Sequence, residues 1–77
     1  MPKFEDLRDM LAEVASIDAD VIEADSLFFD DLGIENVAIQ EFMNALENKY
    51  GFQIPEGDIP RINSIGQLIR YINSKSN

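Results

Sequence analysis

The sequence predicts one all-α domain of three main helices and one short helix, with a long loop between the first two main helices. Three stretches place apolar residues at helical spacing, whereas no stretch alternates with period two for long enough to form a sheet. A chain of 77 residues has room for one thin core. Hydrophobic residues make up 45% and charged residues 27% of the chain, which is typical of a globular protein. We therefore expect residues 1–77 to form a single domain.

The first helix is expected over residues 4–17. Its apolar stripe, spaced by three, four and three, consists of Phe4, Leu7, Leu11 and Val14, with Met10 alongside. Pro2 stands near its start, and Glu5 and Asp6 in the first turn suit the positive end of the helix dipole.

A long loop is expected next, because residues 17–25 fit no single period. Further along, apolar residues stand among acids. We expect this loop to be held to the core by Leu27, by Phe28 or Phe29, and by Leu32. Gly33 then supplies a turn.

The second main helix has the clearest pattern in the chain. Its apolar stripe consists of Ile39, Phe42, Met43, Leu46 and Tyr50. Gly51 is expected to end it, since glycine readily adopts the left-handed conformation found after many helices. Residues 52–55 form an extended link, because the residue before Pro55 disfavours a helical backbone.

The last part of the chain is expected to form a short helix and then a long one. Residues 58–62 are expected to form a brief helical turn. Ser64 followed by Gln67 forms a capping box, which opens a helix. The stripe of this helix consists of Ile65, Leu68, Ile69 and Ile72. Residues 73–77 are expected to fray.

Composition excludes several classes of function. Cysteine and histidine are both absent, which excludes disulfides, thiol nucleophiles, zinc sites of the usual type and histidine-based triads. The net charge of −9 repels nucleic-acid phosphates. No apolar run approaches the roughly 20 residues of a membrane span, and the N-terminus lacks the apolar stretch of a signal peptide. We expect no nucleic-acid binding, no membrane insertion and a cytoplasmic location.

The acids concentrate in one part of the chain. Between Arg8 and Lys49 there is no basic residue but there are eleven acids, Asp9, Glu13, Asp18, Asp20, Glu23, Asp25, Asp30, Asp31, Glu35, Glu41 and Glu47. This distribution is compatible with a solvated surface, with a docking face for basic partners, or with a weak divalent-cation site.

A specific calcium loop is not predicted. Asp18 and Asp20 begin like an EF-hand, but Ile22 stands at a ligand position and Glu23 replaces the turn glycine. We expect no specific metal site.

The stretch from Phe29 to Val37 resembles the signature of acyl carrier proteins, D-L-G-x-D-S-L followed by an amphipathic helix. The continuation over residues 40–51 and 53–55 matches in register, and residues 25–28 and Ser64 have equivalents as well. The similarity covers nearly the whole chain. It implies an acyl-carrier-protein-like bundle, in agreement with the helices expected above.

One position departs from the family pattern. The family's serine carries 4′-phosphopantetheine, whose thiol holds the acyl or aminoacyl cargo, but this chain has Asn36 between Glu35 and Val37. An amide nitrogen is a very poor nucleophile, and no cysteine can carry the cargo instead. We therefore expect Asn36 not to be modified, no cofactor to be attached, and Asn36 to serve as the N-cap of the second main helix.

The resemblance also implies partners, because acids along this helix meet basic patches on partner enzymes in the family. We expect the partner-binding residues to be Ile34, Glu35, Val37, Ala38, Glu41 and Glu47. By resemblance, Phe42, Met43 and Leu46 would line an acyl cavity; without an arm we expect them to form ordinary core. We expect a monomer, and no catalytic residues, since no nucleophile–base pair or metal site can be assembled.

Three functions follow from these observations. The first is an acyl-carrier-like protein without an arm, which docks on basic-surfaced enzymes of fatty-acid, polyketide or related acyl-transfer pathways. The second is a working carrier of fatty-acid, polyketide or peptide synthesis whose attachment site is altered in this chain, with engineering as one source of Asn36. The third is an unrelated acidic helical module, such as a weak cation sensor.

Overall fold

A computed structural model describes residues 2–75, and this part of the chain is helical with no strand. The elements are α1 (Phe4–Ala15), η1 (Ala19–Val21), α2 (Asn36–Tyr50), η2 (Glu56–Arg61) and α3 (Ile65–Lys75), where η1 and η2 are 3₁₀-helices. Three main helices and the short helix η2 confirm the predicted fold class. The 3₁₀ turn η1 lies in a segment that the sequence predicted to be loop.

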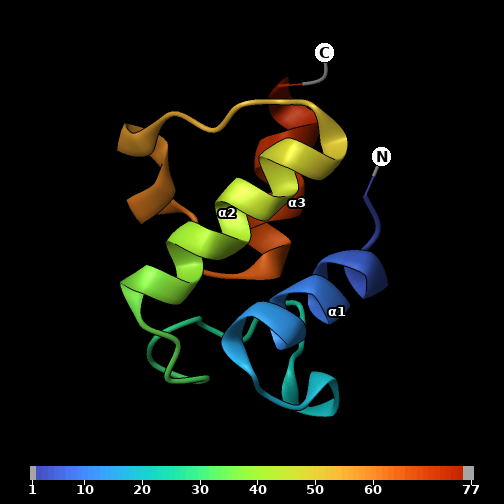
Figure 1. The fold of residues 1–77 in the computed structure, drawn as a ribbon, viewed down its shortest axis with the longest axis vertical. Helices are drawn as coiled ribbons and strands as arrows, with labels where there is room; N and C mark the ends of the chain where they lie inside the picture. Colours follow the sequence, from blue (N-terminus) through green and yellow to red (C-terminus); the bar gives the residue numbers. More distant parts are fainter. Residues whose placement is uncertain (1, 76–77) are drawn as a thin grey trace.

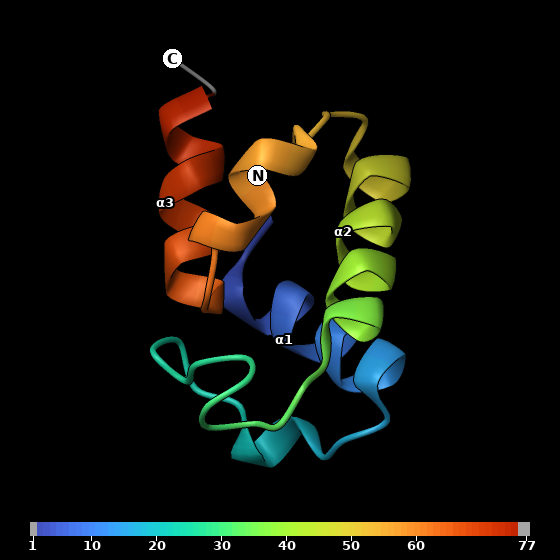
Figure 2. The ribbon, with the colours of Figure 1, turned by 90° about the vertical axis from the view of Figure 1, so that its left-hand side faces the viewer.

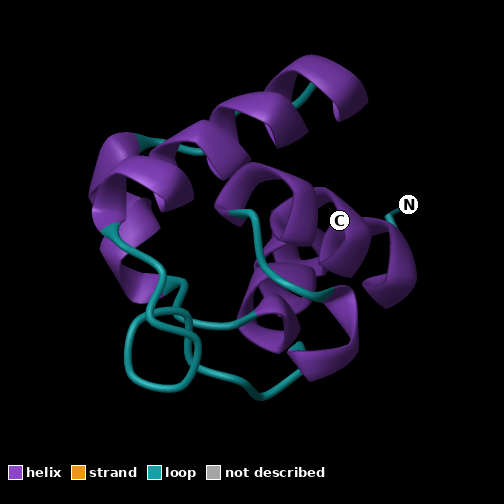
Figure 3. Cartoon of the chain, turned by 60° about the horizontal axis from the view of Figure 1, so that its bottom comes forward, coloured by secondary structure: helices purple, strands orange, loops and turns teal. Residues whose placement is uncertain are grey.

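Helix α1 lies against both α2 and α3 and so joins them. In Figure 1, α2 crosses in front of α3, and α1 lies below them. In Figure 2, α3 and α2 stand upright at opposite sides of the view, and η2 lies nearer the viewer than either. The long loop between α1 and α2 occupies the lower end of the molecule, which comes forward in Figure 3.

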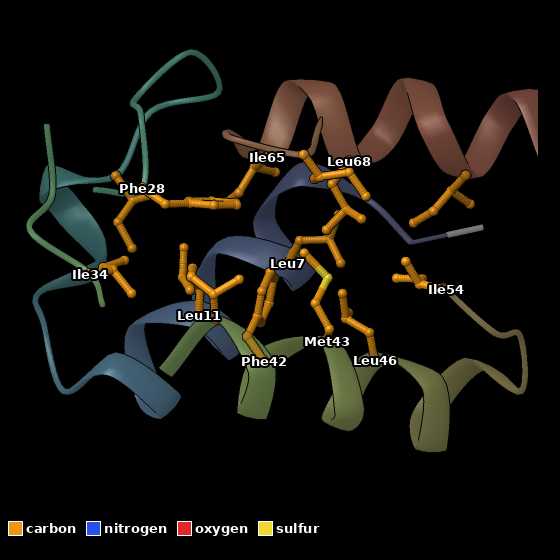
Figure 4. Packing of buried hydrophobic residues seen from close by; sticks show 14 residues of the cluster. Leu7, Leu11, Phe28, Ile34, Phe42, Met43, Leu46, Ile54, Ile65 and Leu68 are labelled. Carbon is orange, nitrogen blue, oxygen red and sulfur yellow. The ribbon is translucent and has the colours of Figure 1, made fainter. Parts of the chain in front are cut away.

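The core is formed by one apolar stripe from each main helix, together with buried residues of the connecting segments, Ile22, Phe28, Ile34, Ile54 and Ile62. Figure 4 shows α1, α2 and α3 directing their leucines, isoleucines and Phe42 into a common interior. The fully buried side chains are Leu7, Leu11, Phe42, Met43, Leu46, Ile65 and Leu68. These positions confirm the predicted stripes of the three helices. Full burial of a leucine or phenylalanine side chain contributes about 1.5–3 kcal/mol to the stability.

The loop before α2 is held to the core by Phe28. Its side chain is 4% exposed, and its ring meets the ring of Phe42 edge to face at a centroid distance of 6.2 Å. Phe29 is 70% exposed, which settles the alternative left open by the sequence. Leu27 is 36% exposed, so its predicted anchoring role is wrong, while Leu32 is half-buried against the core.

Two backbone hydrogen bonds tie this loop to the start of α3. Phe28 N–H donates to the Asn63 carbonyl at 2.8 Å, and Gly66 N–H donates to the Ala24 carbonyl at 2.8 Å. A Cβ at Gly66 would lie 3.0 Å from that carbonyl oxygen, so glycine permits the close approach. The loop therefore has a fixed position relative to the helices.

The helix ends differ in part from the predictions. Helix α1 ends at Ala15, two residues early, because Ser16 adopts the left-handed conformation (φ 57°) and its N–H donates to the Ala12 carbonyl. Gly51 ends α2 as predicted, with φ 77°. Helix α3 continues to Lys75, so the predicted fraying of residues 73–75 is wrong, and residues 76–77 lie outside the described part.

The predicted capping box opens α3 with one changed bond. Gln67 N–H donates to Ser64 Oγ at 3.2 Å, as expected for an N-cap. The Gln67 side-chain oxygen accepts from Asn63 N–H at 2.7 Å. In the standard motif this oxygen would accept from the N–H of the N-cap residue, which is Ser64.

Candidate functional site

The loop closes on itself just before α2. Leu27 N–H donates to Asp31 Oδ2 at 2.8 Å, and Ile34 N–H donates to the Phe28 carbonyl at 2.8 Å. Gly33, with φ 67°, makes the turn that the sequence predicted. These bonds fix the direction in which the chain enters α2.

Asn36 is the first residue of α2 and is exposed. The N-cap position belongs to Glu35, whose backbone is extended (φ −83°, ψ 165°) and whose side chain makes no capping bond. The Glu35 carbonyl accepts from Ile39 N–H at 3.1 Å, and this is the first hydrogen bond of the helix. The helix therefore begins one residue earlier than it would if Asn36 were the N-cap. The predicted N-cap role of Asn36 is therefore wrong. Asn36 stands on the surface at the start of the helix.

Several hollows meet at Asn36. One of them opens between the start of α2 and η2, with a volume of about 380 Å³; its lining residues are Phe28, Phe29, Ile34, Asn36, Ile39, Gln40, Glu56, Ile59, Pro60, Ile62 and Asn63. A second, of about 360 Å³, is bordered by Phe29, Glu35, Asn36 and Val37. Phe42, Met43 and Leu46 line neither hollow and lie in the closed core.

The predicted partner-binding residues fall into three environments. Glu35, Val37 and Glu41 are exposed, with Val37 at 71%, and Ala38 is half-buried beside them. Ile34 is 4% exposed, so its side chain belongs to the core and not to the predicted apolar centre of the surface. The sequence pattern did not distinguish Ile34 from Val37, because both are aliphatic residues flanking the helix start.

Glu47 lies near the opposite end of α2. Eleven residues separate it from Asn36, which corresponds to about 16 Å along the helix axis. Its side chain is half-buried, and Oε2 accepts from Ile54 N–H at 2.7 Å. This carboxylate thus holds the extended link after α2 in addition to carrying charge.

Sequence reasoning missed Phe29 as a surface residue of this site. The double phenylalanine signalled that one ring would be buried, but not which one. The loop's hydrogen bonds decide it, since they direct Phe28 inward and leave Phe29 beside Asn36.

The residues at this position do not fit a phosphopantetheine attachment. The family's chemistry needs a hydroxyl oxygen that attacks a phosphorus, and Asn36 offers a carboxamide whose nitrogen lone pair is delocalised. In the described part of the chain, the three hollows that Asn36 lines have no serine or tyrosine among their lining residues. Ser64 is 4% exposed, and Ser26 Oγ accepts from Glu23 N–H within the loop. Within residues 2–75, no serine or tyrosine hydroxyl therefore borders a hollow together with Asn36.

Within residues 2–75, no three acidic side chains come together in a way that could hold a metal ion. None of the helices in this range is long and apolar enough to cross a bilayer.

Comparison with known families confirms the resemblance in the sequence. The model of the family described as "Phosphopantetheine attachment site" matches residues 5–72. That range spans α1, the loop, α2 and η2 and most of α3, and it includes the start of α2 where Asn36 lies. The match extends over far more than half of the chain, and the all-helical fold agrees with it. This chain therefore belongs to the phosphopantetheine attachment site family of acyl-carrier-type proteins.

Proposed function

We propose that this protein is an acyl-carrier-type protein without a prosthetic arm, which acts by docking the start of α2 on basic-surfaced enzymes of fatty-acid, polyketide or related acyl-transfer pathways. The observation that carries the proposal is Asn36, exposed at the first position of α2 within a chain that belongs to the carrier family. The carrier surface is retained while the atom that would bear the arm is absent.

The proposed docking surface consists of Glu35, Val37, Ala38 and Glu41. Val37 and Glu41 are four residues apart and therefore share one face of the helix. Exposed acids at the rim of an interface mainly raise the association rate, whereas buried apolar contacts lengthen the lifetime of the complex. Ile34 is left out because it is buried, and Glu47 contributes charge only at the far end of α2.

The protein is proposed to work as a monomer and not as an enzyme. Its groups at the site are carboxylates, carboxamides and apolar side chains, which supply no activated nucleophile. Its contribution is recognition by shape and charge.

The docking surface can be tested with a broad-specificity phosphopantetheinyl transferase and the variant Asn36→Ser. With the serine restored, the transferase can attach phosphopantetheine, and the rate of attachment reports how well the transferase binds this surface. In this background, Glu35→Lys with Glu41→Lys should lower kcat/KM at low salt by about tenfold or more and flatten its salt dependence. The matched control is Glu13→Lys, an exposed acid on α1, which should leave kcat/KM within about twofold.

Two results would contradict the docking proposal. One is failure of the transferase to modify the folded Asn36→Ser chain, which would mean that the surface is no longer recognised. The other is an equal effect of the control and of the double variant, which would make the acids a general solubility feature.

A further inference from the structure

Two large apolar side chains project into solvent on either side of Asn36. Phe29 is 70% exposed and Val37 is 71% exposed, the highest values among the large hydrophobic residues of the described chain. Together with Glu35 and Asn36 they border the hollow of about 360 Å³. The fold does not need the Phe29 ring, because Phe28 holds the loop to the core.

Both side chains are carried by backbone that is already fixed. The Phe29 carbonyl accepts from Gly33 N–H at 2.9 Å, and the adjacent Phe28 N–H is bonded to the Asn63 carbonyl. Val37 is the second residue of α2. A partner that covers these side chains therefore has no loop to order, and this lowers the entropic cost of binding.

The charges around this pair select the partner. The exposed acid Glu35 borders the same hollow as the pair, Asp30 borders a hollow with Phe29, and Glu41 borders one with Val37. No basic residue lies between Arg8 and Lys49. An apolar centre with an acidic rim is complementary to an apolar side chain with arginine or lysine around it. The same acids repel the surface of an anionic membrane.

We propose that Phe29 and Val37 form a docking site for a large apolar side chain of a protein partner, flanked there by basic residues. This inference rests on the proposed docking function and adds a residue outside α2 to it. Phe29 is the larger contact, because aromatic side chains that become buried in an interface commonly account for much of its affinity.

The test uses two short helical peptides of equal positive charge. One presents leucines flanked by arginines, and the other has serines in place of the leucines. The full chain is titrated with each peptide, and affinity and backbone amide shifts are measured. The leucine peptide should bind more tightly than the serine peptide, with the largest shifts at Phe29 and Val37.

Substitutions then assign the contact. Phe29→Gln should lower the affinity for the leucine peptide by about tenfold, which corresponds to about 1.4 kcal/mol. Val37→Gln should lower this affinity by a smaller factor. Neither should change binding of the serine peptide. The control is Val21→Gln in η1, where Val21 is 57% exposed but borders none of the hollows at Asn36. Circular dichroism verifies that each variant is folded.

The outcomes separate this inference from the function on which it rests. Equal affinity of the two peptides, or equal effects of Phe29→Gln and Val21→Gln, would overturn the apolar site and leave docking by charge intact. Failure of both peptides to bind would count against the acidic surface and the apolar site together. Binding of the chain to anionic vesicles through Phe29 would identify a membrane surface, not a protein, as the occupant and would overturn the inference.

Discussion

Asn36 combines an unreactive side chain with an exposed position at the start of a helix. Its neighbours Glu35 and Val37 are also exposed, so the helix start is accessible to a partner. The N-cap of α2 is Glu35, and no side-chain hydrogen bond caps the start of this helix. The start of α2 is therefore exposed to a partner, but Asn36 offers no nucleophilic atom.

The first prediction concerns the stability effect of this residue. Asn36→Ala should change the free energy of unfolding by less than about 0.5 kcal/mol, because an exposed residue without a cap bond is lost at little cost. Ser64→Ala is the matched comparison, since Ser64 Oγ accepts from Gln67 N–H, and it should cost about 1 kcal/mol or more. Urea denaturation of both variants measures the two values. A loss of about 1 kcal/mol in Asn36→Ala would show that the side chain does cap α2.

A side-chain hydrogen bond joins helix α3 to the 3₁₀-helix η2. Tyr71 OH donates to Asp58 Oδ2 at 2.6 Å. Partial burial, this hydrogen bond and the charge of Asp58 raise the pKa of Tyr71 from 10.0 to about 12. This bond positions η2, which forms one wall of the hollow of about 380 Å³ at Asn36.

The raised pKa predicts a loss of stability at alkaline pH. The unfolded chain releases the Tyr71 proton near pH 10 and the folded chain near pH 12, so the contribution of Tyr71 is complete below pH 10 and falls as pH rises toward 12. Tyr71→Phe should be less stable than the wild type at pH 8, and the difference should shrink between pH 10 and 12. Urea melts across this range measure it. A constant difference would show that the hydrogen bond does not survive in solution.

The elements also show how far the sequence could predict the structure. Helical periodicity located the three main helices and Gly51 located the end of α2, because burial on one face and glycine's conformational freedom are local properties. The burial of Ile34 depends on how the loop folds on itself, where Ile34 N–H donates to the Phe28 carbonyl. The choice between Phe28 and Phe29 depends on the hydrogen bond from Phe28 N–H to the carbonyl of Asn63, far along the chain. Such long-range contacts leave no periodic trace. The hydrogen bond from Ile54 N–H to the Glu47 carboxylate is local, but it joins α2 to an irregular link in which no periodicity marks the partner.

The molecule has far more acidic than basic residues, fifteen against six. In the described part of the chain the ion pair found is Arg8 with Asp9, at 3.0 Å, and it joins neighbours in sequence on the surface. The other acids between Arg8 and Lys49 repel one another through solvent. The acidic surface proposed to attract basic partners should therefore destabilise the isolated fold.

Salt should relieve this repulsion. Raising sodium chloride from about 0.02 M to about 0.5 M shortens the screening length several-fold and should raise the melting temperature. A gain of about 1 kcal/mol corresponds to about 4–8 °C for a domain of this size. Thermal melts by circular dichroism measure it. A melting temperature independent of salt would show that the acids are dispersed widely enough not to interact.

The central claim is that a member of the phosphopantetheine attachment site family has kept the carrier surface and lost the arm. Intact-mass measurement after co-expression with a broad-specificity phosphopantetheinyl transferase tests it most directly. The wild-type chain should retain its unmodified mass, and the Asn36→Ser chain should gain the mass of one phosphopantetheine. Addition of the arm to the wild-type chain would contradict the claim and make the protein a working carrier.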